Sequence, residues 1–580
     1  MRKLLYPFII SCLGVGGLIS CDKSYLDKST YGTLDAASLA NKNGLESLLI
    51  GSYSMLDGYS VGTTTLGSWS SAASNWVYGS IAGGDAHKGS TGTDQPEINA
   101  IEAYIPIPTN GFFSDKWKVV YEGVTRANIV LKTMPGATDI SAADRKRIEG
   151  EARFLRAHYH FEAKKMWNLV PFIDETMTDF QVPNVKVNVA NDQNIWPRIQ
   201  ADLQFAYDNL PELQGAIGRA NKWSAGAMLG KCLLFQKKYA EAKVVLEQVY
   251  QRGVNPSGVK YGLLDKYQDN FNAATKNSRE SIFASQSSVN DGASAANANY
   301  GDVLNAPYGG PFDCCGFFQP SQDLVNSYKV SATGLPDFDT YNTNPVTSDE
   351  GIAITDPFTP YSGTVDSRLD WTVGRRGIPF LDYGPHQGIS WQRDQAYGGP
   401  YNTKKNVYYK SQKGTLTDGS FWASTVTAIN TNLIRFADVI LWLAECEAEG
   451  GDLTKARAYV NEVRARAAKS SSWVMKDGTN SPAANYKVGL YEQAWPDQAT
   501  ARKAVHFERK LELGMEGHRF FDLVRWGEAE STLTKYLQYE STLRTYLVGV
   551  KFTAGKNEYF PIPQRQIDLS NNVLKQNTGY

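Results

Sequence analysis

The sequence has few cysteines for its length. Its 580 residues contain six, at Cys12, Cys21, Cys232, Cys314, Cys315 and Cys446. This is too few for a chain held together by many disulfides. Cys314 and Cys315 are adjacent, and they either form a vicinal disulfide or remain two thiols. The sequence leaves both possibilities open.

No charge of one sign dominates, and no metal-ligand spacing occurs. The formal net charge is −1, without the basic excess that is typical of nucleic-acid-binding proteins. No CxxC motif is present, and the six histidines are scattered along the chain. We therefore expect no nucleic-acid partner, no metal site and no cofactor.

Long hydrophobic runs are also lacking, apart from one at the N-terminus. Two basic residues precede a mostly apolar run over residues 4–19. This run is too short to span a bilayer well, and the pattern predicts a signal peptide over residues 1–20. The run ends in LISC at 18–21, which resembles a bacterial lipobox. We predict that Cys21 carries acyl chains that anchor the protein to a membrane. The alternative is an ordinary signal peptide followed by an unrelated cysteine.

Helical periodicity is present over much of the remaining chain and predicts a mainly α fold. Two helical hairpins are expected, within 222–252 and 432–468. When the first is shifted by 214 residues, Cys232 falls on Cys446 and other small residues also coincide. Small residues at matched positions let paired helices approach closely. We therefore predict a tetratricopeptide-like helix-pair superhelix, joined to a loop-rich, irregular part that binds the ligand.

Two segments lack this periodicity but are rich in aromatic residues. Residues 58–94 contain many Gly, Ser, Thr and Ala, and residues from about 291 to 425 contain many Gly, Pro and Tyr. Loops that carry large aromatic rings often use them in binding, and such long irregular stretches are usually functional. The alternative is that these rings pin the loops onto the core.

A densely charged stretch over 507–527 is predicted to form a helix that Gly517 breaks, followed by a second short apolar face at Phe520, Leu523 and Val524. Glu508, Glu512 and Glu516 are spaced by four residues, so they follow one side of a helix. Such a cluster is either a catalytic site or an ion-pair network with arginines. We favour the network, with Arg519, Arg525 or neighbouring basic groups as partners.

This stretch resembles the C-terminal signature of the SusD/RagB family of outer-membrane nutrient-binding lipoproteins. The matching residues are Glu508, Arg509, Glu512, Leu513, Glu516, Gly517, Arg519, Asp522, Leu523, Arg525, Trp526 and Gly527. Further family-like signatures lie at 117–128, 151–157, 366–369, 435–438 and 559–580. The resemblance covers residues 21–580. It suggests an N-terminal helical part over 21–270 and a C-terminal part over 271–580, which holds the second hairpin and the long aromatic region.

The resemblance implies a non-enzymatic protein, held by its lipid at the outer membrane and facing the cell exterior. Members of the family bind glycans and pass them to a SusC-like TonB-dependent transporter, and they build their site from the two aromatic zones. Rings stack on the C–H faces of sugars, and polar groups bind the hydroxyls. We therefore expect an oligosaccharide or polysaccharide to contact Trp69, Trp76, Tyr78, Asp85, Tyr300, Tyr308, Phe312 and Trp391.

Trp76 is the leading candidate among these residues, because small residues flank it and Asp85 follows closely. Two other functions remain open. Peptide binding within the same kind of uptake system is the nearer alternative. A glycosidase is the more distant one, because it needs two carboxylates about 5 to 10 Å apart, and no spacing in the sequence singles out such a pair.

Overall fold

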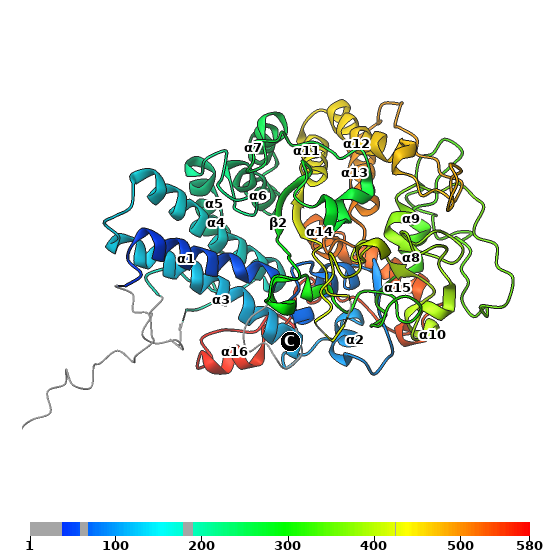
Figure 1. The fold of residues 1–580 in the computed structure, drawn as a ribbon, viewed down its shortest axis with the longest axis horizontal. Helices are drawn as coiled ribbons and strands as arrows, with labels where there is room; N and C mark the ends of the chain where they lie inside the picture. The colour runs from blue at the N-terminus through cyan, green and yellow to red at the C-terminus, as the bar shows by residue number, and fades with distance from the viewer. Residues whose placement is uncertain (1–37, 59–67, 178–188, 421, 424) are drawn as a thin grey trace, which may run out of the picture.

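The computed structural model describes residues 38–58, 68–177, 189–420, 422–423 and 425–580 (Figure 1). The predicted signal peptide and Cys21 lie outside these residues. Across the described ranges, no helix combines the length and the apolar character that a membrane crossing requires.

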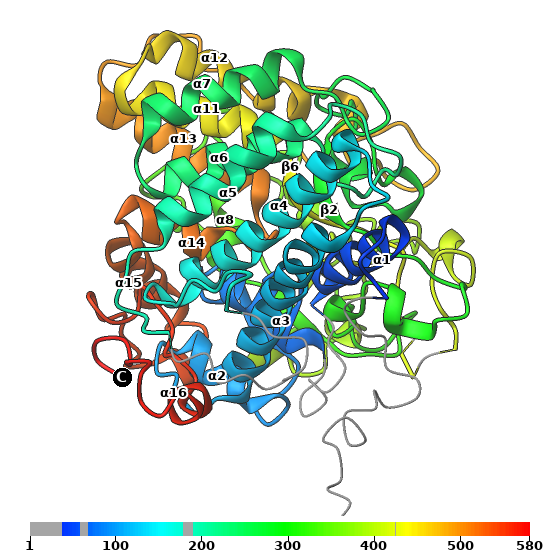
Figure 2. The same cartoon turned by 90° about the vertical axis from the view of Figure 1, so that its left-hand side faces the viewer.

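A row of long helices forms the framework of the molecule. They are α1 (Lys42–Tyr53), α3 (Gly111–Thr133), α4 (Ala142–Trp167), α5 (Trp196–Asn209), α6 (Lys222–Phe235), α7 (Tyr239–Arg252), α11 (Phe436–Gly450), α12 (Leu453–Ala468) and α13 (Gln498–Leu513). From α3 to α7 each helix packs on the next, and α7 then packs on α11, which contacts α12 and α13. In Figures 1 and 2, α7, α11 and α12 lie together at the top of the molecule. The predicted mainly α fold with helix pairs is confirmed.

The two predicted hairpins are α6–α7 and α11–α12, and their small residues lie inside. Cys232 and Cys446 are buried free thiols. At Gly230, an added Cβ would lie 2.4 Å from a side-chain methyl of Leu246 on α7. A larger residue there would push α6 and α7 apart, so glycine allows their close approach.

Three two-stranded antiparallel ribbons connect distant segments of the described chain. They pair β1 (Ala86–Gly89) with β3 (Phe317–Pro320), β2 (Ser281–Ser285) with β6 (Thr431–Arg435), and β4 (Val373–Gly374) with β5 (Asn402–Thr403). The first ribbon places His87 opposite Gln319, and so joins the early Gly/Ser-rich segment to the long aromatic region. Both predicted loop zones therefore meet in space.

Shorter helices complete the fold. They are α2 (Pro96–Glu102), α8 (Gln322–Ser327), α9 (Leu369–Thr372), α10 (Gln395–Gly398), α14 (Arg519–Trp526), α15 (Ala529–Glu540) and α16 (Gln564–Leu569). Three of them, α8 to α10, lie in the predicted irregular region. One hydrophobic cluster contains residues from Leu45 to Leu574, so the N-terminal and C-terminal parts share a core. The proposed boundary near residue 270 stays a prediction.

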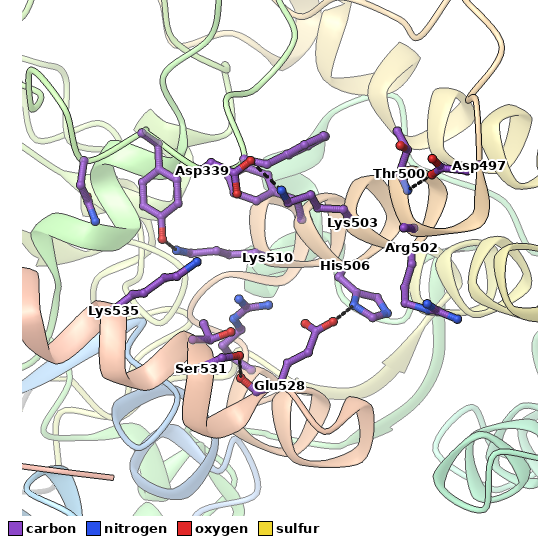
Figure 3. A pocket seen from close by; sticks show the side chains of 17 residues that line it. Asp339, Asp497, Thr500, Arg502, Lys503, His506, Lys510, Glu528, Ser531 and Lys535 are labelled. Carbon is purple, nitrogen blue, oxygen red and sulfur yellow. Dashed lines mark hydrogen bonds and ion pairs between the residues drawn. The ribbon is translucent and has the colours of Figure 1, made fainter.

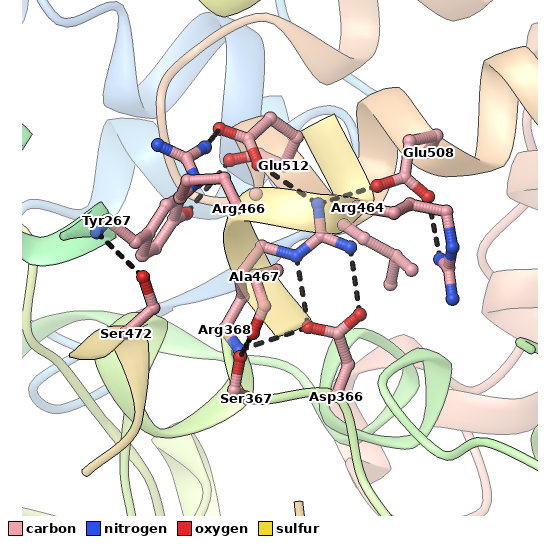
Figure 4. Close-up of polar contacts among 12 residues, drawn as sticks. Tyr267, Asp366, Ser367, Arg368, Arg464, Arg466, Ala467, Ser472, Glu508 and Glu512 are labelled. Carbon is pink, nitrogen blue, oxygen red and sulfur yellow. Dashed lines mark hydrogen bonds and ion pairs between the residues drawn. The ribbon is translucent and has the colours of Figure 1, made fainter. Parts of the chain in front are cut away.

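The predicted charged cluster is a buried ion-pair network (Figure 4). Glu508 and Glu512 lie on α13, whereas Glu516 lies beyond the last residue of this helix, Leu513. Arg368 Nη1 lies 2.7 Å from Glu508 Oε1 and 2.9 Å from Glu512 Oε2. Further partners are Arg464 for Glu508, Arg435 and Arg466 for Glu512, and Arg435 and Lys405 for Glu516. The ion-pair interpretation is confirmed, but Arg519 and Arg525 are not the partners. Arg525 pairs instead with Asp522 and Glu445.

Candidate functional site

Three of the predicted binding residues are buried, and the structure contradicts their assignment as ligand contacts. Only 1% of Trp76 is exposed, and its indole Nε1 donates to the carbonyl of Gly301 at 3.2 Å. The Tyr78 hydroxyl is equally buried, 2.7 Å from the Ser70 carbonyl. Asp85 accepts a hydrogen bond from Met515 N, and burial raises the pKa of its carboxyl to about 6. These side chains hold the early segment onto the core.

Phe312 and Trp391 are also buried, in a second, smaller hydrophobic cluster. This cluster contains Ala306, Phe312, Phe380, Trp391, Val407 and Tyr408. The rings of Phe312 and Trp391 meet edge to face, with centroids 6.0 Å apart. Because the irregular region has few helices to stabilise it, these rings supply a local core. Their predicted contact with a glycan is corrected to a structural role.

Trp69, Tyr300 and Tyr308 remain accessible. Trp69 lies in the short helix η3 (Ser68–Ser71), and Tyr300 begins η9 (Tyr300–Asp302). Their rings are perpendicular, with centroids 6.1 Å apart. Tyr308 is 39% exposed and precedes a turn in which Gly309 and Gly310 both have positive φ. Glycine adopts this conformation without steric cost, so the turn can present Tyr308 at the surface.

Three polar side chains link these rings. Trp69 Nε1 donates to Gln95 Oε1 at 3.0 Å. The adjacent Asp94 accepts from Arg393 Nη1 at 2.6 Å, and the Arg393 guanidinium lies over the Tyr308 ring, 5.2 Å from its centroid. We call these six residues (Trp69, Tyr300, Tyr308, Asp94, Gln95 and Arg393) the aromatic surface.

Buried residues beneath the aromatic surface fix its position. Besides the bond from Trp76 to Gly301, the Ser74 hydroxyl lies 2.6 Å from Asp302 Oδ1. Both contacts hold η9 against the early segment, with Tyr300 at its start. Trp76 is therefore a positioning residue for the ring of Tyr300.

Trp422 is a further exposed ring that the prediction did not include, at 58% exposure. Its segment is held next to η9, because Thr425 Oγ1 donates to the Val303 carbonyl at 2.7 Å. Ser420, Ala423 and Ser424 lie near Trp422 in the sequence, as small residues lie near Trp76, and this signal was available. Asp94, Gln95 and Arg393 had no comparable signal, since Arg393 is separated from Asp94 by 299 residues.

The chemistry of the aromatic surface suits binding. Asp94 is the one carboxylate among its six side chains, and it is ion-paired with Arg393. Across the described residues, no group of three or more His, Cys, Asp or Glu is placed to hold a metal ion. Cys314 and Cys315 are placed as a vicinal disulfide, which is one of the two possibilities that the sequence left open.

Comparison with known proteins identifies the family of this chain. A sequence model described as the SusD family matches residues 279–580, just over half of the chain. The chain belongs to the SusD/RagB family. A second model of the same kind, described as starch-binding and associating with the outer membrane, matches residues 24–234.

The individual relatives of this SusD-family protein have low sequence identity to it, but the similarity extends over most of the chain. It is 25% identical over 498 residues to SusD-like protein P25 of Formosa agariphila, covering 80% of each chain. It is also 25% identical over 433 residues to a SusD-like protein of Bacteroides ovatus, covering 71% of this chain and 65% of that one.

Solved structures share the fold of this SusD-family protein. A laminarin-binding SusD-like protein superposes with a TM-score of 0.63 at 24% identity, covering 93% of this chain and 100% of that one. Surface glycan-binding protein A from Bacteroides thetaiotaomicron, in complex with laminarihexaose, superposes with a TM-score of 0.63 at 19% identity, covering 92% and 99%. Both are glycan-binding proteins, and the tetratricopeptide-like helical fold is confirmed.

Proposed function

We propose that this protein is a cell-surface lipoprotein that captures an oligosaccharide or polysaccharide on its aromatic surface and delivers it to a SusC-like TonB-dependent transporter. The observation that carries the proposal is the aromatic surface itself. Three accessible rings and three polar side chains come together from segments near residues 69, 94, 300–308 and 393.

The arrangement fits the two kinds of surface that a sugar offers. Its apolar C–H face stacks on rings such as Tyr308, while its hydroxyls accept from Arg393 or exchange hydrogen bonds with Gln95. Single sugar contacts are weak, so several rings in a row favour an oligomer that occupies several subsites. Laminarin is a sensible first probe, because similar structures are named for binding it.

Membrane attachment and delivery rest on other observations. The apolar leader that ends at Cys21 supports acylation there, and the matched family description names association with the outer membrane. A tethered binder contributes to uptake only when its cargo reaches a pore. Gentle detergent extraction of cells grown on the inducing nutrient should therefore co-purify a large outer-membrane protein. Repeated recovery of this chain alone would count against delivery.

Affinity electrophoresis in gels that contain soluble polysaccharides tests glycan binding. At least one polysaccharide should retard the protein. Trp69→Ala and Tyr308→Ala should each weaken binding about fivefold or more, because stacking on an aromatic ring is worth roughly 1 to 3 kcal/mol for a base and a sugar falls toward the lower end. Val244→Ala, an exposed position on α7, is the matched control and should bind normally.

Three results would contradict the proposal. Normal retardation of both ring variants would place the site elsewhere, with Trp422 as the next ring to change. Displacement by peptides, without retardation by any polysaccharide, would favour the peptide-binding alternative. New reducing ends after incubation with the glycan would indicate a glycosidase.

A further inference from the structure

A cleft of about 730 Å³ lies between α13, α15 and the segment around residues 338–342 (Figure 3). Its size is within the range of small-molecule sites. None of its lining residues belongs to the aromatic surface. Figure 3 shows His506 and Lys503 on α13, and Lys535 on α15, around the same opening.

Most of the charged groups in the cleft are neutralised by neighbours. Lys503 pairs with Asp339 at 2.6 Å, Lys510 with Asp323 at 2.7 Å, and Arg502 with Glu449. The carboxylate of Asp497 caps α13 by accepting from Thr500 N at 2.7 Å.

Two cations of the cleft have no such partner. Among the described residues, neither Arg519 nor Lys535 makes a hydrogen bond or ion pair through its side chain. Arg519 is half-buried, and the nearby acids that feel its charge are Asp85 and Glu528. Lys535 is exposed on α15. The cleft therefore has positive charge available for an anion.

His506 supplies a buried polar atom without a partner. The residue is 6% exposed, and its ring stacks on Trp526 with centroids 3.6 Å apart. Nδ1 lies 3.0 Å from Glu528 Oε1, while Nε2 is buried and has no hydrogen-bond partner among the described residues. A buried polar group without a partner costs free energy, and this nitrogen belongs to a ring that lines the cleft.

The other wall of the cleft is aromatic. Phe338 and Phe507 lie with ring centroids 5.2 Å apart, and Tyr341 is 5.7 Å from Phe507. Ser531 and Thr532 add hydroxyls from α15. A simple inorganic ion would not use an aromatic wall, whereas the C–H face of a sugar ring does.

We propose that this cleft is a second saccharide site, selective for sugars that carry a carboxylate or sulfate group. The anionic group lies at Arg519 and Lys535, and the sugar ring packs on the wall formed by Phe338 and Tyr341. Carboxylate and sulfate oxygens both accept hydrogen bonds from arginine and lysine, so they share one recognition chemistry. The inference goes beyond glycan capture on the aromatic surface and does not depend on it.

The test uses the full chain in detergent with Trp69→Ala and Tyr308→Ala combined, which removes the rings of the aromatic surface. Calorimetric titration compares a uronic-acid trisaccharide, a sulfated trisaccharide, a neutral trisaccharide and sodium sulfate. At least one anionic sugar should bind, five times or more tightly than the neutral one, and the tighter of the two identifies the anionic group. Binding should weaken with added salt, because the screening length falls below about 8 Å above 0.15 M.

Further substitutions in the same background decide the location. Lys535→Gln and Arg519→Gln should each weaken binding of the anionic sugar about fivefold. Lys551 is an exposed lysine elsewhere, and Lys551→Gln should leave this binding unchanged. Lys535 is solvent-exposed, so the Lys535→Gln variant should fold normally, and the test stays valid if Arg519→Gln fails to fold. Equal affinity for the neutral sugar, no effect of Lys535→Gln, or equally tight binding of sulfate alone would each overturn the proposal. If the aromatic surface does not bind glycan, a separate result will show it: Trp69→Ala and Tyr308→Ala will be retarded normally in the polysaccharide gels.

Discussion

Trp69 and Trp76 lie seven positions apart in one Gly/Ser-rich segment, but the fold uses them differently. Trp69 is partly accessible beside Tyr300, whereas Trp76 is enclosed by Phe317, Phe318 and the Gly301 carbonyl. Small flanking residues let a ring face either way, so composition alone does not distinguish a binding ring from an anchoring ring.

Trp76→Ala is expected to lower stability rather than remove a sugar contact. Deleting a buried aromatic side chain costs about 3 to 5 kcal/mol, and η9 would lose its support. The melting temperature should fall clearly, while Trp69→Ala should leave it nearly unchanged. Differential scanning fluorimetry of both variants checks this. An unchanged melting temperature for Trp76→Ala would show that the ring is not an anchor.

Glu512 should be among the most sensitive charged residues. Burial alone would raise the pKa of its carboxyl, but Arg466, Arg435 and Arg368 outweigh burial and hold that pKa well below its ordinary value. Glu512→Gln should cost about 3 to 5 kcal/mol at neutral pH, because it leaves buried arginines without compensation.

The pH dependence gives the second part of this test. A lowered pKa contributes stability above the ordinary value of about 4.5, and this contribution is lost as pH falls through the folded-state pKa. Lowering the pH below about 4.5 should therefore reduce the difference in the free energy of unfolding between wild type and Glu512→Gln, as measured by denaturant titration. Glu530→Gln, an exposed glutamate on α15, is the control. A gap that widens with acid would contradict the network.

At the scale of elements, a buried histidine connects β1 to two helices. His87 Nδ1 lies 3.0 Å from Glu102 Oε1 on α2, and Nε2 lies 3.1 Å from Glu540 Oε2 on α15. Burial lowers the pKa of His87, but hydrogen bonds and charge from Glu102 and Glu540 outweigh it and raise the pKa to about 9. These contacts tie β1, and with it the first ribbon, to α2 and α15.

His87 predicts a loss of stability on the alkaline side. A raised pKa contributes stability that is fully present below the unfolded value of about 6.5 and is lost as pH rises toward 9. The shift corresponds to roughly 3 kcal/mol. The free energy of unfolding should therefore exceed that of His87→Gln most at pH 6, and the difference should shrink by pH 9. A difference that stays constant over this range would contradict a charged His87.

At the scale of the whole molecule, attachment and binding belong to different parts of the chain. Cys21→Ala should move the protein from the membrane fraction to the soluble fraction, while retardation by the bound polysaccharide stays unchanged. Fractionation at high salt, in a strain without the partner transporter, measures this. Persistent membrane association under those conditions would contradict the lipid anchor.

The helix framework was predictable because its information is local. Apolar spacing and helix-ending residues predicted α6, α7, α11 and α12, and the match between Cys232 and Cys446 predicted two similar hairpins. Three glutamates at a spacing of four also predicted a charged cluster, of which Glu508 and Glu512 lie on α13 and Glu516 lies just beyond its end. Their partners were not predictable, since Arg368, Arg435 and Arg464 come from three other segments.

The sequence by itself therefore determined the mainly α class, the family and the two zones that supply the aromatic surface. Tertiary structure alone decided which rings remain accessible. Trp76 and Gly301 are in contact but lie 225 residues apart in the chain, and Asp94 and Arg393 lie 299 residues apart. Exposure depends on such long-range packing, which leaves no periodic trace in the sequence, whereas helix formation depends on neighbours within a few residues.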